Sequence, residues 1–294
     1  MPLYDATVDR SESNSSHTQM LELVGHDRRV LDVGCATGYL AEALAAQGCT
    51  VSGVEYDAEA AERARPHLDT LVVADLSAVS LGEAFGGEQF DVVVFGDVLE
   101  HLVDPVTVLR GAAQVLAPSG SVVISLPNVS HGSVRLALLQ GRWRYTDTGL
   151  LDRTHVRFFT RASLHAMLAE AGFVATEVRT TTADPLAVEV AVDPGDLPDG
   201  VVEWVRRQPD ALTYQFVLRA IRREGSGELV AAQEEARALA EMLEHTRHEA
   251  DRLQRERDAA VADVAALRGT MSMRVLAAPR AVYGRLRAVL GRAR

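Results

Sequence analysis

The residues Val30–Leu40 constrain the fold more than any other part of this sequence. An apolar run is followed by Gly34 and Gly38 and then by a helix-forming segment rich in alanine and leucine. This order predicts a buried strand, a glycine turn and a helix whose first N–H groups point at a ligand. Glu55 follows a second apolar run, where its carboxylate can accept hydrogen bonds from a ribose diol. Together these features predict a site for a nucleotide-like ligand.

Short apolar runs alternate with helical segments between residues 29 and 94, which is typical of a parallel sheet with helices on both faces. Later in the chain we expect helices at 105–116 and 161–171, and strands at 121–126, 173–180 and 213–222. Residues 1–224 are therefore predicted to form a doubly wound α/β domain. Its sheet has seven mostly parallel strands, the last one antiparallel. Residues 183–211 are rich in Asp and Pro and are expected to form a loop.

The glycine pattern discriminates between cofactors. A dinucleotide fingerprint needs glycine at positions 34, 36 and 39, but Ala36 and Tyr39 occupy two of them, which disfavours NAD(P). The pattern present is Asp32-x-Gly34-x-x-x-Gly38. It resembles the first motif of the class I S-adenosylmethionine-dependent methyltransferases. That resemblance implies a Rossmann-like methyltransferase fold and S-adenosylmethionine as the cofactor.

The resemblance covers roughly residues 29–126 and implies roles for several carboxylates. Glu55 matches the ribose ligand, Asp75 the residue beside the adenine amine, and Asp97 begins the segment that lines the methionine end. This cofactor carries no phosphate, so its hydroxyls, amine and ammonium require acceptors instead of an arginine clamp. Cys35 is expected to be a small buried filler and not a nucleophile. The implied cofactor-binding residues are Asp32, Gly34, Cys35, Ala36, Gly38, Glu55, Tyr56, Asp75, Leu76, Asp97 and Val98.

The acceptor side is expected in residues 128–161, because the family builds its acceptor pocket from the N-terminal segment and the insert after strand five. This insert is rich in arginine and aromatic residues. Such a composition suits an anionic acceptor such as a phosphate-bearing sugar. The alternative is that the arginines are solvated and that Phe158 and Phe159 fill the core. The expected substrate-binding residues are Arg142, Trp143, Arg153 and Arg157.

Methyl transfer to a hydroxyl benefits from a general base, and the insert offers His131 and His155. Either residue is a candidate to take the hydroxyl proton. His101 follows the cofactor motif so closely that we expect it to begin a helix or to line the pocket wall. No metal site is expected.

The segments 127–131 and 150–160 resemble methyltransferases that act in bacterial surface-polysaccharide or secondary-metabolite assembly. We therefore expect an enzyme that methylates an acceptor hydroxyl, first of all on a sugar or glycan in cell-surface polysaccharide biosynthesis. A second interpretation is O-methylation of a small quinone-like molecule or secondary metabolite. A third is a non-catalytic coiled-coil scaffold whose domain only senses S-adenosylmethionine.

Residues 225–270 begin with a hinge at Gly225–Gly227 and then contain a heptad pattern of leucine, alanine and valine, sustained from Leu229 to Leu267. The pattern predicts a coiled-coil helix that forms a homo-oligomer, most simply a parallel dimer. The alternative is a solvated single helix.

Charge is distributed unevenly along the chain. The net charge of -11 argues against nucleic-acid binding, but residues 271–294 contain six arginines and no acidic residue. This basic amphipathic tail suits peripheral contact with an anionic membrane surface or with an acidic partner. There is no apolar stretch of membrane-spanning length, no apolar signal core at the N-terminus, and only two cysteines. We expect a cytoplasmic protein, located in part at the inner face of the membrane.

Overall fold

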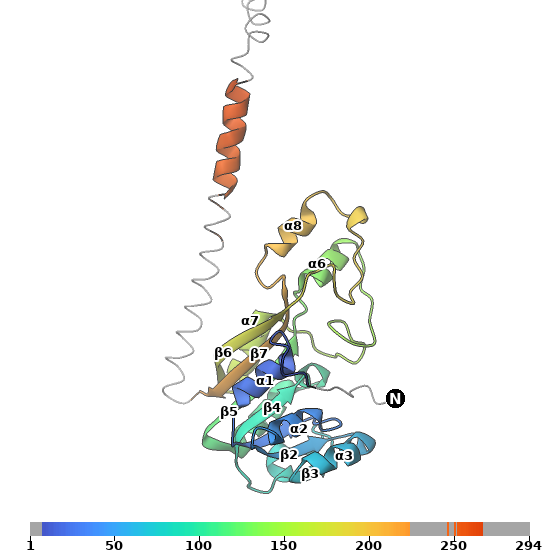
Figure 1. The fold of residues 1–294 in the computed structure, drawn as a ribbon, viewed down its shortest axis with the longest axis vertical. Helices are drawn as coiled ribbons and strands as arrows, with labels where there is room; N and C mark the ends of the chain where they lie inside the picture. The colour runs from blue at the N-terminus through green and yellow to red at the C-terminus, as the bar shows by residue number, and fades with distance from the viewer. Residues whose placement is uncertain (1–7, 224–245, 247–249, 251, 267–294) are drawn as a thin grey trace, which may run out of the picture. The chain divides into compact units, whose positions relative to one another are not determined.

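The computed structural model describes residues 8–223, 246, 250 and 252–266 (Figure 1). The chain divides into two compact units, residues 1–235 and 236–294. The first unit contains the sheet and all the residues predicted to bind ligands.

The first unit is built on one seven-stranded sheet with the order β3-β2-β1-β4-β5-β7-β6. Strands β1 to β5 are parallel, whereas β7 pairs in the antiparallel direction with both β5 and β6. This confirms the predicted doubly wound, mostly parallel seven-stranded sheet with β7 antiparallel. The strands are β1 (Arg29–Val33), β2 (Thr50–Glu55), β3 (Thr70–Val73), β4 (Phe90–Gly96), β5 (Leu116–Pro127), β6 (Phe173–Thr182) and β7 (Thr213–Arg222).

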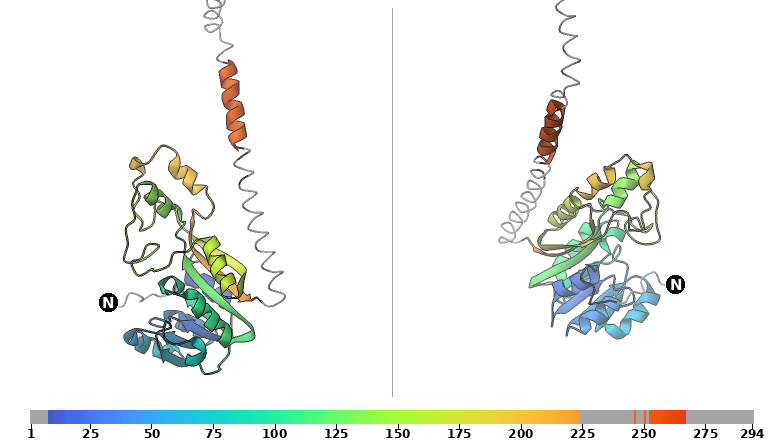
Figure 2. Two further views of the ribbon diagram at one scale, coloured as in Figure 1. Left: turned by 180° about the vertical axis from the view of Figure 1, so that it is seen from behind. Right: turned by 45° about the horizontal axis from the view of Figure 1, so that its top comes forward.

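Helices cover both faces of the sheet, and the two faces are seen from opposite sides in Figures 1 and 2. The helices are α1 (Ser16–Val24), α2 (Tyr39–Ala45), α3 (Ala58–Ala64), α4 (Leu81–Ala84), α5 (Pro105–Val115), α6 (Gly132–Leu139), α7 (Arg161–Glu170) and α8 (Val201–Arg206). Short 3-10 helices lie at η1 (Arg65–His67), η2 (Leu99–His101) and η3 (Pro194–Asp196).

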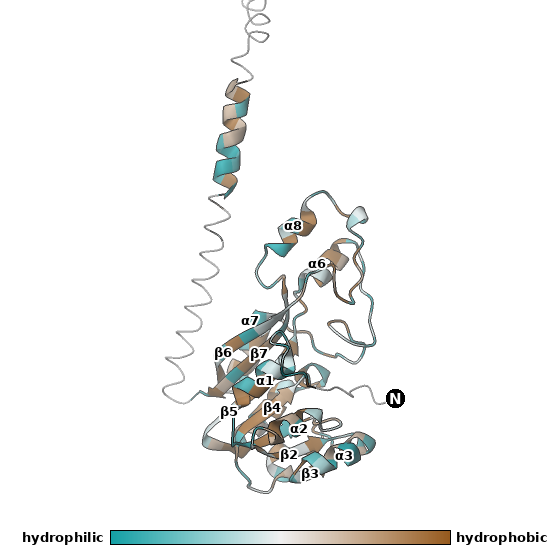
Figure 3. Ribbon diagram, viewed as in Figure 1, coloured by the Kyte–Doolittle hydropathy of each residue, from teal (hydrophilic) through white to brown (hydrophobic). Residues whose placement is uncertain are grey.

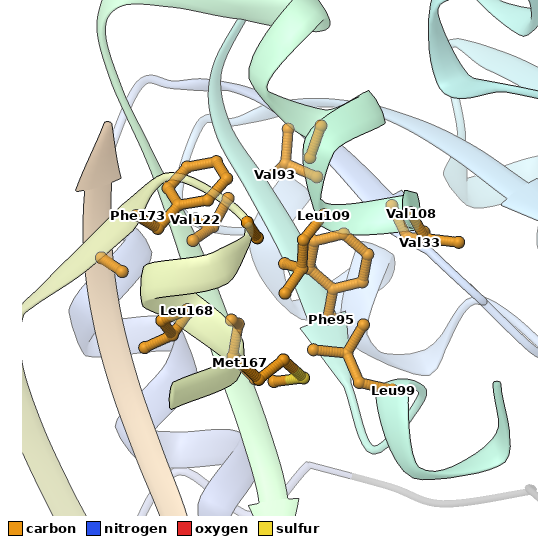
Figure 4. Packing of buried hydrophobic residues seen from close by; sticks show 14 of the residues in the cluster. Val33, Val93, Phe95, Leu99, Val108, Leu109, Val122, Met167, Leu168 and Phe173 are labelled. Carbon is orange, nitrogen blue, oxygen red and sulfur yellow. The ribbon is translucent and has the colours of Figure 1, made fainter. Parts of the chain in front are cut away.

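The alternation of side chains along the strands divides the core into two layers. In β4, Val92 and Val94 pack with α1 and α2, while Val93 and Phe95 pack with α4, α5 and α7 on the opposite face (Figure 4). Both faces of the central strands are therefore buried, which explains why these strands are almost uniformly apolar in the sequence (Figure 3).

Three helices lie where the sequence patterns did not predict them. Helix α1 was not predicted, α6 lies inside the insert, and α8 lies in the segment expected to be a loop. The expectation of a loop over the whole of 183–211 is therefore wrong. Leu136 of α6 and Val205 of α8 are buried together in a small cluster with Ala211, and this contact between distant segments stabilises two short helices.

Residues 252–266 are helical, and Leu253 and Val264, two positions of the predicted heptad seam, are exposed in the single chain. Most of the heptad pattern and the whole basic tail at 271–294 lie outside the described residues, so the coiled coil, the oligomer and the membrane contact remain predictions. Within the described part of the chain, no helix is long and apolar enough to cross a membrane.

Leu109 is fully buried in the cluster shown in Figure 4, between α5 and the central strands. We expect Leu109→Ala to lower the free energy of unfolding by about 2–5 kcal/mol, because it removes buried methyl groups and leaves a cavity. Urea denaturation measures this change. Leu139→Ala, at a side chain that is 60% exposed, is the control and should change stability by less than about 0.5 kcal/mol. Equal effects of the two substitutions would contradict this description of the core.

Candidate active site

The turn after β1 needs both of its predicted glycines. Gly34 and Gly38 have φ angles of 74° and 84°, a region that residues with a side chain rarely adopt. A Cβ on Gly34 would lie 2.7 Å from the side chain of Val98, and one on Gly38 would lie 2.8 Å from the backbone of Ala64. The N–H groups of Gly34 and Cys35 both donate to the carbonyl of Val54. The turn is therefore bound tightly to the end of β2.

Glu55 completes this turn from the end of β2. One carboxylate oxygen accepts a hydrogen bond from the N–H of Ala36 at 2.9 Å, and the other accepts from Tyr56 at 2.9 Å and Asp57 at 3.0 Å. A carboxylate has about four acceptor positions, so these three bonds leave capacity for a ribose hydroxyl. The side chain is thus a structural clamp that keeps an acceptor position available at the expected ribose end.

Asp32 is the most perturbed carboxyl group in the glycine turn region. It is 2% exposed, and its Oδ2 atom has no hydrogen-bond partner among the described residues. Burial, assisted by the charge of Glu55, raises the pKa of Asp32 to about 7. A buried carboxylate with an unpartnered oxygen favours a nearby cation. The position therefore fits a positively charged cofactor such as S-adenosylmethionine.

The remaining cofactor candidates differ in exposure. Tyr56 is largely exposed, and Asp75 is an exposed residue whose carboxylate accepts a hydrogen bond from the N–H of Ser77 at 2.8 Å. Leu76 packs against the edge of the core. The thiol of Cys35 is buried, and burial raises its pKa, so it has the character of a filler and not of a nucleophile.

Asp97 lies just after β4, with a φ angle of 54°. Its Oδ1 atom accepts hydrogen bonds from Ser125 Oγ and from Gln215 Nε2, each at 2.9 Å. The charge of Asp97 also acts on His17 in α1. One carboxylate therefore connects the ends of β4, β5 and β7 and lies close to α1.

A cavity of about 560 Å³ lies next to this residue, since His17 and Gln215 are among its lining residues. Tyr214 and Glu189 also line it, with the Tyr214 hydroxyl donating to Glu189 at 2.9 Å. Burial lowers the pKa of His17, although the charge of Asp97 opposes the shift. No sequence pattern pointed to these four residues, because they belong to segments far from the cofactor motifs.

His131 does not fit the expected role of general base. Its ring caps α6: Nδ1 accepts from the N–H of Ser133, and Nε2 lies 3.1 Å from the carbonyl of Ala183. A ring bound in this way carries its proton on Nε2 and donates it to the carbonyl. Both nitrogens are thus used within the protein, and burial lowers the pKa of His131.

His155 has a different environment. It is buried, its Nδ1 atom has no hydrogen-bond partner among the described residues, and its ring contacts that of His101 with centroids 4.8 Å apart. His101 lies in η2, directly after Glu100, which is 1% exposed. Burial raises the pKa of Glu100 well above its usual range, and the charge of Asp97 adds to the shift. The structure thus brings His155 to the end of β4, beside the cofactor motif.

The arginines proposed for the acceptor already have partners. Arg142 donates to Asp196 at 2.8 Å, Arg153 pairs with Asp147 at 2.5 Å, and Arg157 donates to the carbonyl of Val103. Their contacts therefore do not support a clamp for an anionic acceptor.

The aromatic side chains of the insert pack against one another. The ring of Trp143 lies edge-to-face against those of Phe158 and Tyr145, with ring centroids 5.4 Å and 6.3 Å apart. The ring centroids of Phe158 and His155 are 6.2 Å apart. Phe159 is part of the core, as the alternative interpretation of the insert expected. An aromatic row therefore leads from His155 to the exposed surface of the insert.

The capping role of His131 can be tested by stability. We expect His131→Ala to lower the free energy of unfolding by about 1–3 kcal/mol, because a helix cap and a buried hydrogen bond are lost. His131→Asn should recover part of this loss, since asparagine also caps helices. Urea denaturation of both variants is the measurement. Wild-type stability of His131→Ala would contradict the capping role.

Comparison with known proteins agrees with this geometry. Residues 10–178 match a family described as a methyltransferase domain. A protein from Psychrobacter arcticus named Ubiquinone biosynthesis O-methyltransferase is 32% identical over 181 residues, covering 59% of this chain and 69% of that protein. One of the same name from Thiobacillus denitrificans is 36% identical over 165 residues, covering 54% and 70%.

A solved structure has the same fold. The crystal structure of a SAM dependent methyltransferase from Archaeoglobus fulgidus matches with a TM-score of 0.50 and 17% identity, over 72% of this chain and 94% of that chain. Fold, glycine turn and carboxylate placement agree with the family match over more than half of the sequence. The chain belongs to the S-adenosylmethionine-dependent methyltransferases, and S-adenosylmethionine is its cofactor.

Proposed function

We propose that the protein transfers a methyl group from S-adenosylmethionine to a hydroxyl oxygen of a small aromatic or quinone-like molecule. The observation that carries this proposal is the similarity to proteins named Ubiquinone biosynthesis O-methyltransferase, which are matched over 69% and 70% of their length. The insert supports the same acceptor class, because Arg142 and Arg153 are paired within the protein while Trp143 and Phe158 form an aromatic row beside His155. The first expectation, a sugar or glycan hydroxyl, is less well supported.

The chain provides complementary groups for each part of the cofactor. When bound, S-adenosylmethionine supplies an electrophilic methyl group on a positively charged sulfur. Gly34 and Gly38 allow the backbone to approach it closely, Glu55 accepts from the ribose, and Asp32 compensates its positive charge. Asp75 and Tyr56 are assigned to the adenine end.

The acceptor is assigned to the cavity beside Asp97, where Gln215 and Tyr214 orient it. His17 lines this cavity, and its lowered pKa keeps the imidazole neutral near pH 7, ready to accept a proton. As the new O–C bond forms in line with the breaking S–C bond, the S–C electron pair stays on sulfur and the hydroxyl proton goes to His17.

Affinity for S-adenosylmethionine is expected to depend on the ionisation of Asp32. Because its carboxyl group has a pKa of about 7, it must lose its proton before it can stabilise a cation, so binding strengthens as the pH rises through that value. Isothermal titration calorimetry should show about tenfold tighter binding at pH 8 than at pH 6.

Asp32→Asn is the matched control, since it keeps the shape of the side chain and removes its charge. This variant should bind the cofactor more weakly at pH 8 and show no pH dependence across the same range. The same change of S-adenosylmethionine affinity with pH in both proteins would contradict the proposed role of Asp32 in cofactor binding. Absence of binding in the wild type would defeat the proposed enzyme altogether.

Activity is tested with labelled S-adenosylmethionine and a panel of catechols, quinols, nucleotide sugars and lipid-linked glycans. We expect label in the catechols or quinols, and His17→Ala should lower kcat by about 10²–10⁴ without changing cofactor affinity. His26→Ala, at an exposed position before β1, should retain full activity. Label only in the sugars would replace the proposed acceptor with the glycan alternative.

A further inference from the structure

Two segments far apart in the sequence meet beside Asp97. Glu100 and His101 lie in η2 at the end of β4, and His155 lies in the insert. The backbone N–H groups of Val156 and Arg157 both donate to the carbonyl of Glu100 at 3.0 Å. The insert is thus hydrogen-bonded to η2 at the point where these three side chains converge.

Three potential metal ligands face one another here. One ligand atom from each of Glu100, His101 and His155 lies within 4.8 Å of the other two. Nε2 of His155 is 4.0 Å from Oε1 of Glu100. An ion with metal–ligand distances of about 2.0–2.2 Å spans roughly 4 Å between opposite ligands, so a small inward movement completes the site.

The carboxylate of Glu100 is buried without any hydrogen-bond partner in the described part of the chain. The residue is 1% exposed. The neighbouring charges of Asp97 and Asp152 are also negative. Burying an unpaired carboxylate is costly, and a cation between it and the two imidazoles removes that cost. An ion pair with His155 alone would leave the second oxygen unpartnered.

The surroundings hold His101 in the orientation of a metal ligand. Its Nδ1 atom lies 3.3 Å from the carbonyl of Thr154 and 3.1 Å from the Thr154 hydroxyl. Thr154 is fixed in turn by Asp152, which accepts from its N–H at 2.7 Å and its hydroxyl at 2.6 Å. Metal-binding histidines commonly donate one ring N–H to a carbonyl in this way and coordinate through the other nitrogen.

We propose that Glu100, His101 and His155 bind a divalent transition-metal ion of the Zn²⁺, Mn²⁺ or Co²⁺ class. One carboxylate and two imidazoles suit these ions better than Mg²⁺ or Ca²⁺, which prefer oxygen ligands alone. Three protein ligands leave coordination positions open. The expectation of no metal site is replaced by this proposal.

The role of the ion rests on the proposed function. Asp97 lies three residues before Glu100, and its Oδ1 atom accepts a hydrogen bond from Gln215 in the wall of the proposed acceptor cavity, so this segment connects the two sites. An ion held by Glu100, His101 and His155 would supply Lewis acidity that lowers the pKa of a hydroxyl bound beside it, and His17 would take the proton. His155 then acts as a ligand and not as the base.

The test uses the untagged full-length protein, stripped with a chelator and titrated with Co²⁺. We expect visible absorption bands that saturate at one ion per chain, competition by Zn²⁺, and a higher Tm on addition of Zn²⁺. Glu100→Gln and His155→Asn should each weaken Co²⁺ binding at least tenfold. His26→Ala is the matched control and should bind one ion as the wild type does.

Circular dichroism and calorimetry with S-adenosylmethionine establish that each variant is folded. Co²⁺ uptake that is equal in the wild type and in folded Glu100→Gln and His155→Asn would overturn the site, as would no uptake by the wild type. Metal binding without methylation of any phenolic acceptor would leave the site standing and refute the proposed acceptor. Phenol methylation that chelation and Glu100→Gln leave unchanged would refute the catalytic role of the ion.

Discussion

The carboxylate of Glu55 connects the two strand ends on which the cofactor site depends. From the end of β2 it accepts a hydrogen bond from Ala36 in the turn after β1. Strand β1 lies between β2 and β4 in the sheet, and Val98 after β4 fills the space beside Gly34. Fixing the turn therefore also fixes the segment after β4. One buried side chain thereby holds in place three loops that leave the same edge of the sheet.

The candidate cofactor-binding residues could be predicted from the sequence, because they lie at or directly after apolar runs. Asp32, Glu55 and Asp97 all lie at or just after the carboxyl ends of strands, and parallel strands bring those ends to a common edge. Local patterns therefore sufficed to predict the strands and to place these three candidate residues at one edge of the sheet. Helix α1 was missed because its stability comes from packing of Met20 and Leu23 against the sheet, which no local pattern displays.

The proposed acceptor site was harder to predict from the sequence, because contacts between distant segments assemble it. His17, Gln215 and Tyr214 come from the first helix and the last strand, and none stands in a recognisable motif. His131 and His155 appeared equivalent in the sequence, yet one caps a helix while the other meets Glu100. Hydrogen-bond partners decide what a histidine can do, and these follow only from the three-dimensional fold.

The place of β7 in the sheet sets the order in which the domain can be completed. It is the last strand in the described part of the chain, yet it lies between β5 and β6, and β6 has no other partner in the sheet. During synthesis on the ribosome, β1 to β5 can pair as they emerge, whereas β6 must wait for β7. Because β7 also brings Gln215 and Tyr214, the cavity proposed for the acceptor can be completed only after β7 has been synthesised.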